Sequence, residues 1–397
     1  MTLETDDILV KHSSFNYIGC LNAGFSPADE PEKKERSIMN RSTALLYFCK
    51  SIAGILVLVS SLAFAADSAR HSKPRELVLL NWSEYIDLEL VAKFEQQFNA
   101  KLRETYFESD DLRDDMMLET DGKGYDLAVV NGISVDLYRN RGWLSAIDEA
   151  QIPNLKHIDS RWLDAFPGIE GYAVPYFWGT VGIAYRKDLV ETPLTSWMDI
   201  LQPADYLHGK ISMVENSRDL LGMALKALGY SANSTDAKHI KAAGKLLLAQ
   251  RPHVKTYTYI ALSEESALVS GDIIAAMLFS GDALMVQEHH EEIDYVVPAE
   301  GGNLWVDYLA VLEGSKNKDL AWAFINFLNE PENAAQLAKF VYYATPNKAA
   351  EKLLPAEFLE DPVIYPSQAV LSKSEFYKPL PPRAMKKRNS TFTQIMQ

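Results

Sequence analysis

The feature that most constrains the fold is a repeated alternation of short apolar runs with amphipathic segments. LVLLNW (77–82) predicts a buried strand, and LELVAKFEQQFN (88–99) places its apolar residues at helical spacing. LRETYF (102–107) alternates as a strand does, DDLRDDMMLE (110–119) indicates a helix with an acidic first turn, and YDLAVVN (125–131) indicates another buried strand. Repeated strand–helix–strand units predict a parallel sheet covered by helices on both faces.

The same alternation returns in the second half of the chain. The chain of 397 residues is long enough for more than one domain, so we expect two α/β lobes. Ligands of open α/β sheets bind beyond the carboxyl ends of the strands, so the loop tips are where we expect a site. The later segments are two strands at 209–214 and 304–313, helices at 217–228, 318–329 and 332–343, and a helix–strand–helix run at 267–289.

An uncharged stretch near the N-terminus predicts export. SIAGILVLVSSLAFA (51–65) follows the basic Arg41 and Lys50 and ends in a small-x-small cleavage pattern. Its fifteen residues are short for a membrane span, which needs about 20, and the layout is that of a secretory signal. We therefore expect residues 1–38 to be a leader from a mis-assigned start, residues 39–65 to be a signal peptide, and the protein to be periplasmic; a retained anchor is the alternative.

Composition and the absence of motifs exclude several classes of function. The net charge of -15 argues against a nucleic-acid partner, because the phosphate backbone repels an acidic chain. Cys20 and Cys49 both precede the expected cleavage site, which leaves the exported protein with neither a disulfide nor a thiol nucleophile. No dinucleotide-binding, phosphate-loop or serine-nucleophile motif is present, so we expect no enzyme activity.

Two clusters could hold a metal, although each has a simpler explanation. His289 and His290 lie in EHHEE (288–292), where adjacent side chains of a helix point about 100° apart, so a solvated helix end explains them better. Tyr342 and Tyr343 form a pair of the kind that ferric-ion carriers use, but an aromatic helix end is the commoner reading. We therefore expect no metal.

Acidic and aromatic residues gather at the expected loop tips. Taken alone, Trp305 could be a core residue, and Asp219 could simply stabilise the first turn of a helix. Taken together, carboxylates bind ammonium groups, and aromatic faces attract cations and cover methylene chains. The set therefore predicts an aliphatic amine as ligand: Trp82, Glu84, Tyr85, Asp219, Phe279, Trp305, Asp307 and Tyr343.

Many segments over about three quarters of the chain occur in the order of one family. They are NWSEYID, YDLAVVNG, VPYFWGT, TSWMDI, GMALKALGYSANSTDAKHI, EGGNLWVDYLA, KDLAWAFINFLNEPENA and ATPNKAA. In these the chain resembles the periplasmic spermidine/putrescine-binding proteins of polyamine ABC transporters. The resemblance implies a two-lobed periplasmic binding protein (Venus flytrap) fold and capture of a polyamine in the cleft, without a cofactor. It also implies a monomer that delivers its ligand to an inner-membrane ABC permease.

The resemblance assigns binding roles residue by residue. The first binding loop of the family falls on Trp82, Ser83, Glu84 and Tyr85, its Trp-x-Asp on Trp305 and Asp307, an amine-contacting acid on Asp219, and a wall tyrosine on Tyr343. Other positions depart from the family, and they leave open which amine binds, although Glu215 could replace one lost charge. The departures are Asn131 for a serine, Ile133 for a tyrosine, Asn216 for an acid, Phe279 for a tryptophan and Tyr377 for a glutamine.

The resemblance also implies how the chain divides. We expect lobe one to hold residues 75–180 and 307–352, and lobe two to hold residues 181–306 and 353–397. Trp82, Glu84, Tyr85 and Tyr343 would then lie on lobe one, Asp219 and Phe279 on lobe two, and Trp305 and Asp307 at a crossover. The alternative function is a sensor, similar to the norspermidine-sensing periplasmic proteins, that regulates a membrane signalling receptor.

Overall fold

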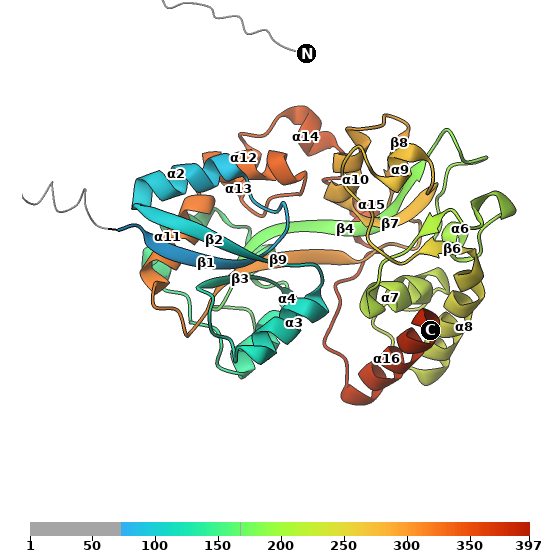
Figure 1. The fold of residues 1–397 in the computed structure, drawn as a ribbon, viewed down its shortest axis with the longest axis horizontal. Coiled ribbons are helices and arrows are strands. Elements are labelled where there is room, and N and C mark those ends of the chain that lie inside the picture. The colour runs from blue at the N-terminus through green and yellow to red at the C-terminus, as the bar shows by residue number, and fades with distance from the viewer. Residues whose placement is uncertain (1–72, 167) are drawn as a thin grey trace, which may run out of the picture. The chain divides into compact units, whose positions relative to one another are not determined.

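The computed structural model describes residues 73–166 and 168–397 (Figure 1). The expected leader, signal peptide and both cysteines lie outside the described residues. Within the described range, none of the helices combines the length and the apolar character needed to cross a membrane.

The described residues form a nine-stranded sheet in the order β2-β1-β3-β9-β4-β7-β5-β6, with β8 paired to β4. β1 is parallel to β2 and β3, and β5 is parallel to β6 and β7. The strands are β1 (Arg75–Trp82), β2 (Ala100–Phe107), β3 (Leu127–Asn131), β4 (Val174–Arg186), β5 (Ile211–Ser212), β6 (Val254–Thr256), β7 (Ala275–Phe279), β8 (Ile293–Val296) and β9 (Leu304–Val311).

The expectation of a purely parallel sheet is wrong at the centre. β9 is antiparallel to both β3 and β4, and β4 is antiparallel to β7. β9 pairs with β3 of one half, and β4 pairs with β7 of the other half. β4 and β9 therefore join the two halves and are not units of a strand–helix–strand repeat. Each of the outer halves keeps the parallel pairing that the alternation predicts.

β4 itself was not predicted, because its sequence has no alternation. All thirteen residues of VPYFWGTVGIAYR are buried, and the run contains Pro175, Gly179 and Gly182, which are unusual inside a strand. The register shifts between Pro175 and Phe177, which marks a bulge. A Cβ at Gly182 would lie 2.3 Å from the carbonyl oxygen of Val296, so close strand approach explains the glycine.

The expected helices form within a residue or two of their predicted bounds, and local capping explains where they begin. The side chain of Ser109 caps α3 and that of Asn131 caps α4. The helices are α2 (Leu88–Phe98), α3 (Asp110–Glu119), α4 (Gly132–Asn140), α5 (Ser160–Leu163), α6 (Met198–Leu201), α7 (Ser217–Ala227), α8 (Ala237–Gln250), α9 (Ala267–Ser270), α10 (Ser280–Gln287), α11 (Lys318–Leu328), α12 (Pro331–Val341), α13 (Lys348–Glu351), α14 (Ala356–Glu360), α15 (Gln368–Leu371) and α16 (Pro382–Met396).

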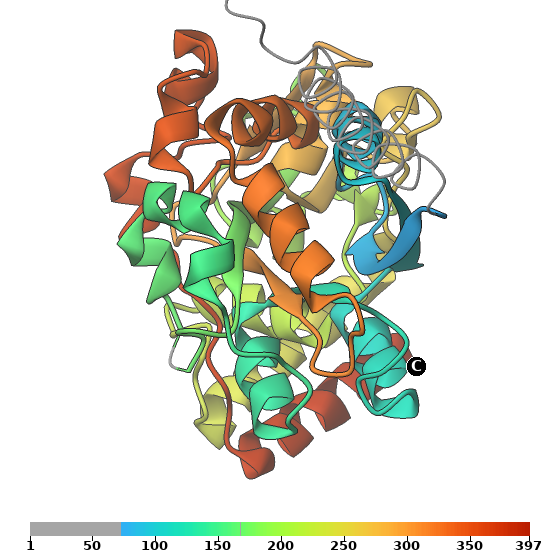
Figure 2. The ribbon, with the colours of Figure 1, turned by 90° about the vertical axis from the view of Figure 1, so that its left-hand side faces the viewer.

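The hydrophobic core has separate parts in the two halves of the sheet. In the half built on β1–β3, Phe94 of α2 and Phe324 of α11 pack in one cluster, and α3 and α4 cover the opposite face. In the half built on β5–β7, Trp197, Leu221 and Leu247 belong to another cluster. Figure 2 shows the late orange helices beside the cyan and green elements of the early chain, so the chain returns to its first half after β9. The exact lobe boundaries stay a prediction.

Candidate ligand-binding site

Asp307 lies in β9, where the two halves of the sheet join. Its neighbours across the sheet are Asn131 of β3 and Phe177 of β4. The hydroxyl of Tyr85 donates to Asp307 Oδ2 at 3.2 Å. Burial raises the pKa of this carboxyl to about 7, and the nearby charge of Asp110 adds to the rise. The structure thus places an acid with a perturbed pKa at the joint of the molecule.

Aromatic rings from four separate elements meet beside this acid. Trp305 packs edge-on against Tyr343, with ring centroids 4.8 Å apart, and against Phe279 at 6.0 Å. Tyr343 in turn lies 6.0 Å from Tyr85. The rings come from the loop between β1 and α2, the end of β7, the start of β9 and the segment after α12. The structure therefore brings together four aromatic residues that the sequence analysis proposed for one site.

Asp282 belongs to the same cluster, and the sequence analysis missed it. It lies in the first turn of α10 and accepts hydrogen bonds from the hydroxyls of Tyr343, at 2.5 Å, and Tyr259. Burial raises its pKa, and the negative charge of Glu84 adds to the rise. Its position three residues after the strand tip at Phe279 was the available signal. The sequence analysis did not assign Asp282 to the site because the helix dipole already explains an acid in a first helical turn.

Asp219 forms a second acidic point, in the first turn of α7. It is buried, and Tyr377 donates a hydroxyl hydrogen bond to its Oδ1 at 2.8 Å. Burial raises its pKa to about 6. The neighbouring Asn216 caps α7 by accepting from the backbone amides of Arg218 and Asp219. Asn216 therefore still caps the helix, but it lacks the negative charge that the acid of the family would carry at this position.

The residues of the first binding loop, Trp82 to Tyr85, differ in burial and in their contacts. Trp82 packs on Phe107 with centroids 4.4 Å apart, and it helps to lower the pKa of Asp307 by hydrogen bonding. Ser83 and Glu84 are exposed, and Glu84 has a left-handed φ of 55°. Tyr85 is buried and reaches the aromatic cluster. The loop thus turns sharply after Trp82 and directs Tyr85 inward.

Comparison with known protein families shows which family this chain belongs to. Residues 89–365 match the family described as bacterial extracellular solute-binding protein. The chain belongs to this family. The resemblance drawn from the sequence is confirmed by this match and by the similar proteins that follow.

Two named proteins are similar to this solute-binding protein over most of their length. The spermidine/putrescine-binding periplasmic protein of Escherichia coli K12 is 32% identical over 323 residues, which cover 81% of this chain and 92% of the relative. The norspermidine sensor of Vibrio cholerae is 32% identical over 292 residues, covering 73% of this chain and 80% of the relative.

Among solved structures, a putative spermidine/putrescine ABC transporter from Listeria monocytogenes has 33% identity and a TM-score of 0.73, covering 81% of this chain and 99% of that one. The spermidine/putrescine substrate-binding protein of Streptococcus pneumoniae has 31% identity and a TM-score of 0.70, with coverage of 81% and 98%. The expected two-lobed α/β binding-protein fold is thereby confirmed.

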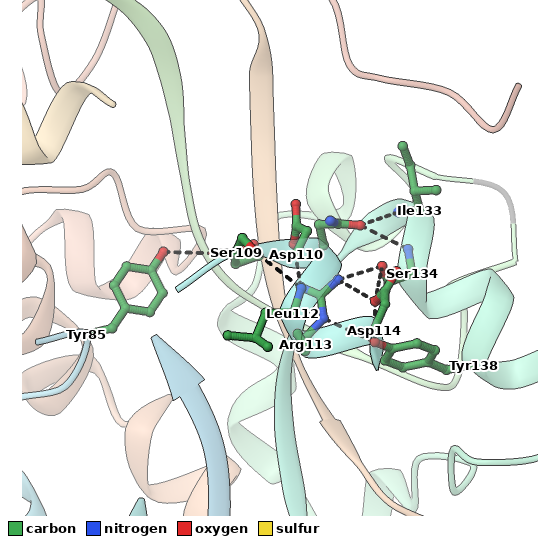
Figure 3. A network of polar contacts seen from close by, with 11 residues as sticks. Tyr85, Ser109, Asp110, Leu112, Arg113, Asp114, Ile133, Ser134 and Tyr138 are labelled. Atoms are coloured by element: carbon green, nitrogen blue, oxygen red, sulfur yellow. Dashed lines mark hydrogen bonds and ion pairs between the residues drawn. The ribbon is translucent and has the colours of Figure 1, made fainter. Parts of the chain in front are cut away.

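A buried network at the edge of the site orders the solute-binding protein's helices α3 and α4 (Figure 3). Arg113 is fully buried and donates to Asp110 at 2.5 Å, Asp114 at 3.0 Å and Ser134 at 2.7 Å. Asn131 accepts from the amides of Ile133 and Ser134, so this family departure acts as the N-cap of α4. The network fixes Asp110, whose charge acts on Asp307.

The two metal candidates have other partners in this solute-binding protein. Tyr342 donates to Glu288, and Tyr343 donates to Asp282, so the paired tyrosines engage two different acids. His289 follows the end of α10 and is exposed. Across residues 73–166 and 168–397, no group of three or more histidine, cysteine or acidic side chains has a metal-binding arrangement.

Proposed function

We propose that this protein binds a linear polyamine of the putrescine or spermidine type between its two lobes. The observation that carries the proposal is the state of three acids, Asp219, Asp282 and Asp307. Each has a pKa raised by burial and accepts from tyrosine hydroxyls. Among the described residues, no lysine or arginine forms an ion pair with any of them. A ligand ammonium would supply the missing cation, because a buried carboxylate is costly without one.

The aromatic cluster supplies the second half of the recognition. Tyr85, which donates to Asp307, lies beside Tyr343, and Tyr343 lies beside Trp305. Such rings attract ammonium groups and cover the methylene chain between them. We assign the remaining predicted residues, Trp82, Ser83, Glu84, Asp219 and Phe279, to the same site, and we add Asp282.

Delivery to an inner-membrane ABC permease is the role we favour. The similar structure from Streptococcus pneumoniae is named as an ABC transporter substrate-binding protein, and the relative from Escherichia coli is named as a spermidine/putrescine-binding periplasmic protein. The protein then acts as a monomer, without catalysis, cofactor or nucleic acid, after export and removal of residues 1–65. N-terminal sequencing of periplasmic material would test the export step; a chain that begins at Met1 would contradict it.

Sensing is the second candidate, and one observation favours it. The norspermidine sensor of Vibrio cholerae and the spermidine/putrescine-binding periplasmic protein of Escherichia coli have the same identity to this chain, 32%. In that case the liganded protein would regulate a membrane receptor. Uptake of labelled polyamine by a strain lacking the gene separates the roles, since loss of uptake supports transport and unchanged uptake supports sensing.

Calorimetry tests the ligand class. Residues 66–397 should bind putrescine, spermidine or norspermidine, and should not bind amino acids or sugars. The variant Asp307→Asn is the control for binding at this site. Tight binding of a sugar or ferric ion with no response to any polyamine would overturn the proposal.

A further inference from the structure

Two neighbouring helices of lobe two carry a charge opposite to that of the whole protein. α8 reads AKHIKAAGKLLLAQ and α16 reads PRAMKKRNSTFTQIM. Neither sequence contains an acidic residue, whereas the complete chain has 54 acids against 39 lysines and arginines. The charge of these two helices is therefore opposite to that of the rest of the protein. Binding of an amine does not explain this difference.

Most basic side chains of the two helices are exposed, and the two helices pack against each other. Arg388, the buried exception, donates to the carbonyl oxygens of Ala232 and Ser234, directly before α8, and so fixes α16 against its start. Thr391 packs so closely on Gly244 that an added Cβ would lie 2.4 Å from its methyl group. Figure 1 shows α8 and α16 side by side. The exposed residues, here called the basic face, are Lys238, Lys241, Lys245, Arg383, Lys386 and Lys387.

The residues of the basic face form no ion pairs with the described part of the chain. In the part of the chain that the structure describes, none of its six residues forms an ion pair, although lysines elsewhere do, as Lys226 does with Glu375. Asp236, which precedes α8, caps the helix by accepting from the amide of Lys238. Six unpaired cations on one surface therefore remain available to an external anion.

We propose that the basic face binds the anionic phospholipid surface of the membrane. Protein interfaces are enriched in aromatic residues and depleted in lysine. The basic face instead has five lysines and one arginine, and Leu248 is the only large apolar residue exposed on α8 or α16. Diffuse attraction to anionic headgroups needs charge alone, and each basic residue near such a surface strengthens binding by roughly fivefold.

The acidity of the remaining molecule gives this contact an orientation. With a net charge of -15 for the whole chain, most of the surface is repelled by an anionic membrane. The side with α8 and α16 is attracted, so the protein would meet the membrane with that side first. Such an arrangement would concentrate the protein next to any membrane partner.

Vesicle sedimentation tests the proposal directly. Residues 66–397, which include the compact unit at 73–397, are mixed with phosphatidylglycerol vesicles or with phosphatidylcholine vesicles at low salt. Binding is expected only to the anionic vesicles, and it should be lost near 0.5 M salt because the Debye length shrinks to a few ångströms. Lys241→Gln, Lys245→Gln and Lys386→Gln in one variant should weaken binding on the order of a hundredfold.

A matched variant gives the control. Lys156, Lys316 and Lys352 are exposed lysines away from the basic face, and replacing all three with glutamine changes the net charge equally. This control should bind vesicles as the unchanged protein does. Equal loss in both variants, binding to phosphatidylcholine, or no binding to phosphatidylglycerol would each overturn the proposal. Retention on an acidic peptide without vesicle binding would instead assign the face to an acidic protein.

Discussion

At the scale of single residues, Asp307 is a buried acid, and no lysine or arginine of the described residues forms an ion pair with it. Burial raises its pKa to about 7, and its hydrogen-bond partners are the side chains of Tyr85 and Trp82. Asp307→Asn keeps the shape and removes the charge, so polyamine affinity should fall tenfold or more, since losing one partner of a buried charge pair costs about 2–5 kcal/mol. Calorimetry measures the affinity, and thermal melting without ligand shows whether the fold is kept. Unchanged affinity would mean that the ammonium binds elsewhere.

The same pKa predicts how stability and binding depend on pH. Because the folded pKa of Asp307 lies above its ordinary value of 3.8, the unliganded protein should lose stability as pH rises from about 4 through 7. Polyamine affinity should rise over the upper part of this range, because the ligand needs the carboxylate. Melting and calorimetry from about pH 6 to pH 8 should show opposite trends, and both should be weaker in Asp307→Asn. A pH-independent affinity would contradict this.

Asp282 shows where reasoning from the sequence stopped. The sequence predicted Tyr85, Phe279, Trp305 and Tyr343, which meet in space, because each lies at a strand or helix end. Asp282 received no assignment, since an acid in a first helical turn has a local explanation, and only the structure shows its two tyrosine partners.

Replacing Asp282 tests whether it binds an amine. Asp282→Asn should lower polyamine affinity roughly tenfold or more. Tyr259→Phe, which removes one hydrogen bond to the same carboxylate, is the matched control and should have the smaller effect. If the tyrosine variant were the more damaging of the two, Asp282 would have a structural role only.

At the scale of elements, the sequence predicted the helices and the strand β9 well, but it missed β4 and the antiparallel pairing at the centre of the sheet. α3 has the predicted bounds, and the signal for it was the acidic first turn with Asp110 and Asp111. β4 carries no alternation because it is buried on both faces, and the antiparallel pairing of β9 depends on residues far away in the chain. Pairing partners are a tertiary property, which local pattern cannot supply.

A contact between α12 and α10 gives a prediction at this scale. Tyr342, which follows α12, donates to Glu288, which follows α10, and this bond raises the pKa of Tyr342 to about 12. The bond joins elements of the two halves without touching the acids of the site. Tyr342→Phe should therefore speed polyamine release by a few-fold, since one partly exposed hydrogen bond contributes about 0.5–1.5 kcal/mol.

Stopped-flow measurement of polyamine release would test this contact, and Glu288→Gln supplies the second half of a double-mutant cycle. The combined variant should release ligand no faster than Tyr342→Phe alone, because both changes remove the same bond. Fully additive effects would mean that the two residues act independently.

At the scale of the whole molecule, the site draws on both halves of the sheet. Tyr85 and Tyr343 come from the half with β1–β3, Asp219 and Asp282 come from the half with β5–β7, and Asp307 lies between them. The sequence alone indicated two lobes and a cleft, but it could not show which side chains meet across it. Only the structure, in which β4 and β9 join the two halves, shows which side chains meet.

This division of the site predicts closure on the ligand. A ligand shifts a conformational equilibrium only by its differential affinity for the two states, and a polyamine touching acids of both halves binds the closed state better. Saturating polyamine should therefore lower the radius of gyration measured by X-ray scattering. In Asp282→Asn, which weakens the contact to one half, the same reduction should require more ligand. If calorimetry showed saturation while the scattering curve stayed constant, binding would occur without closure, and the cleft would already be formed in the free protein.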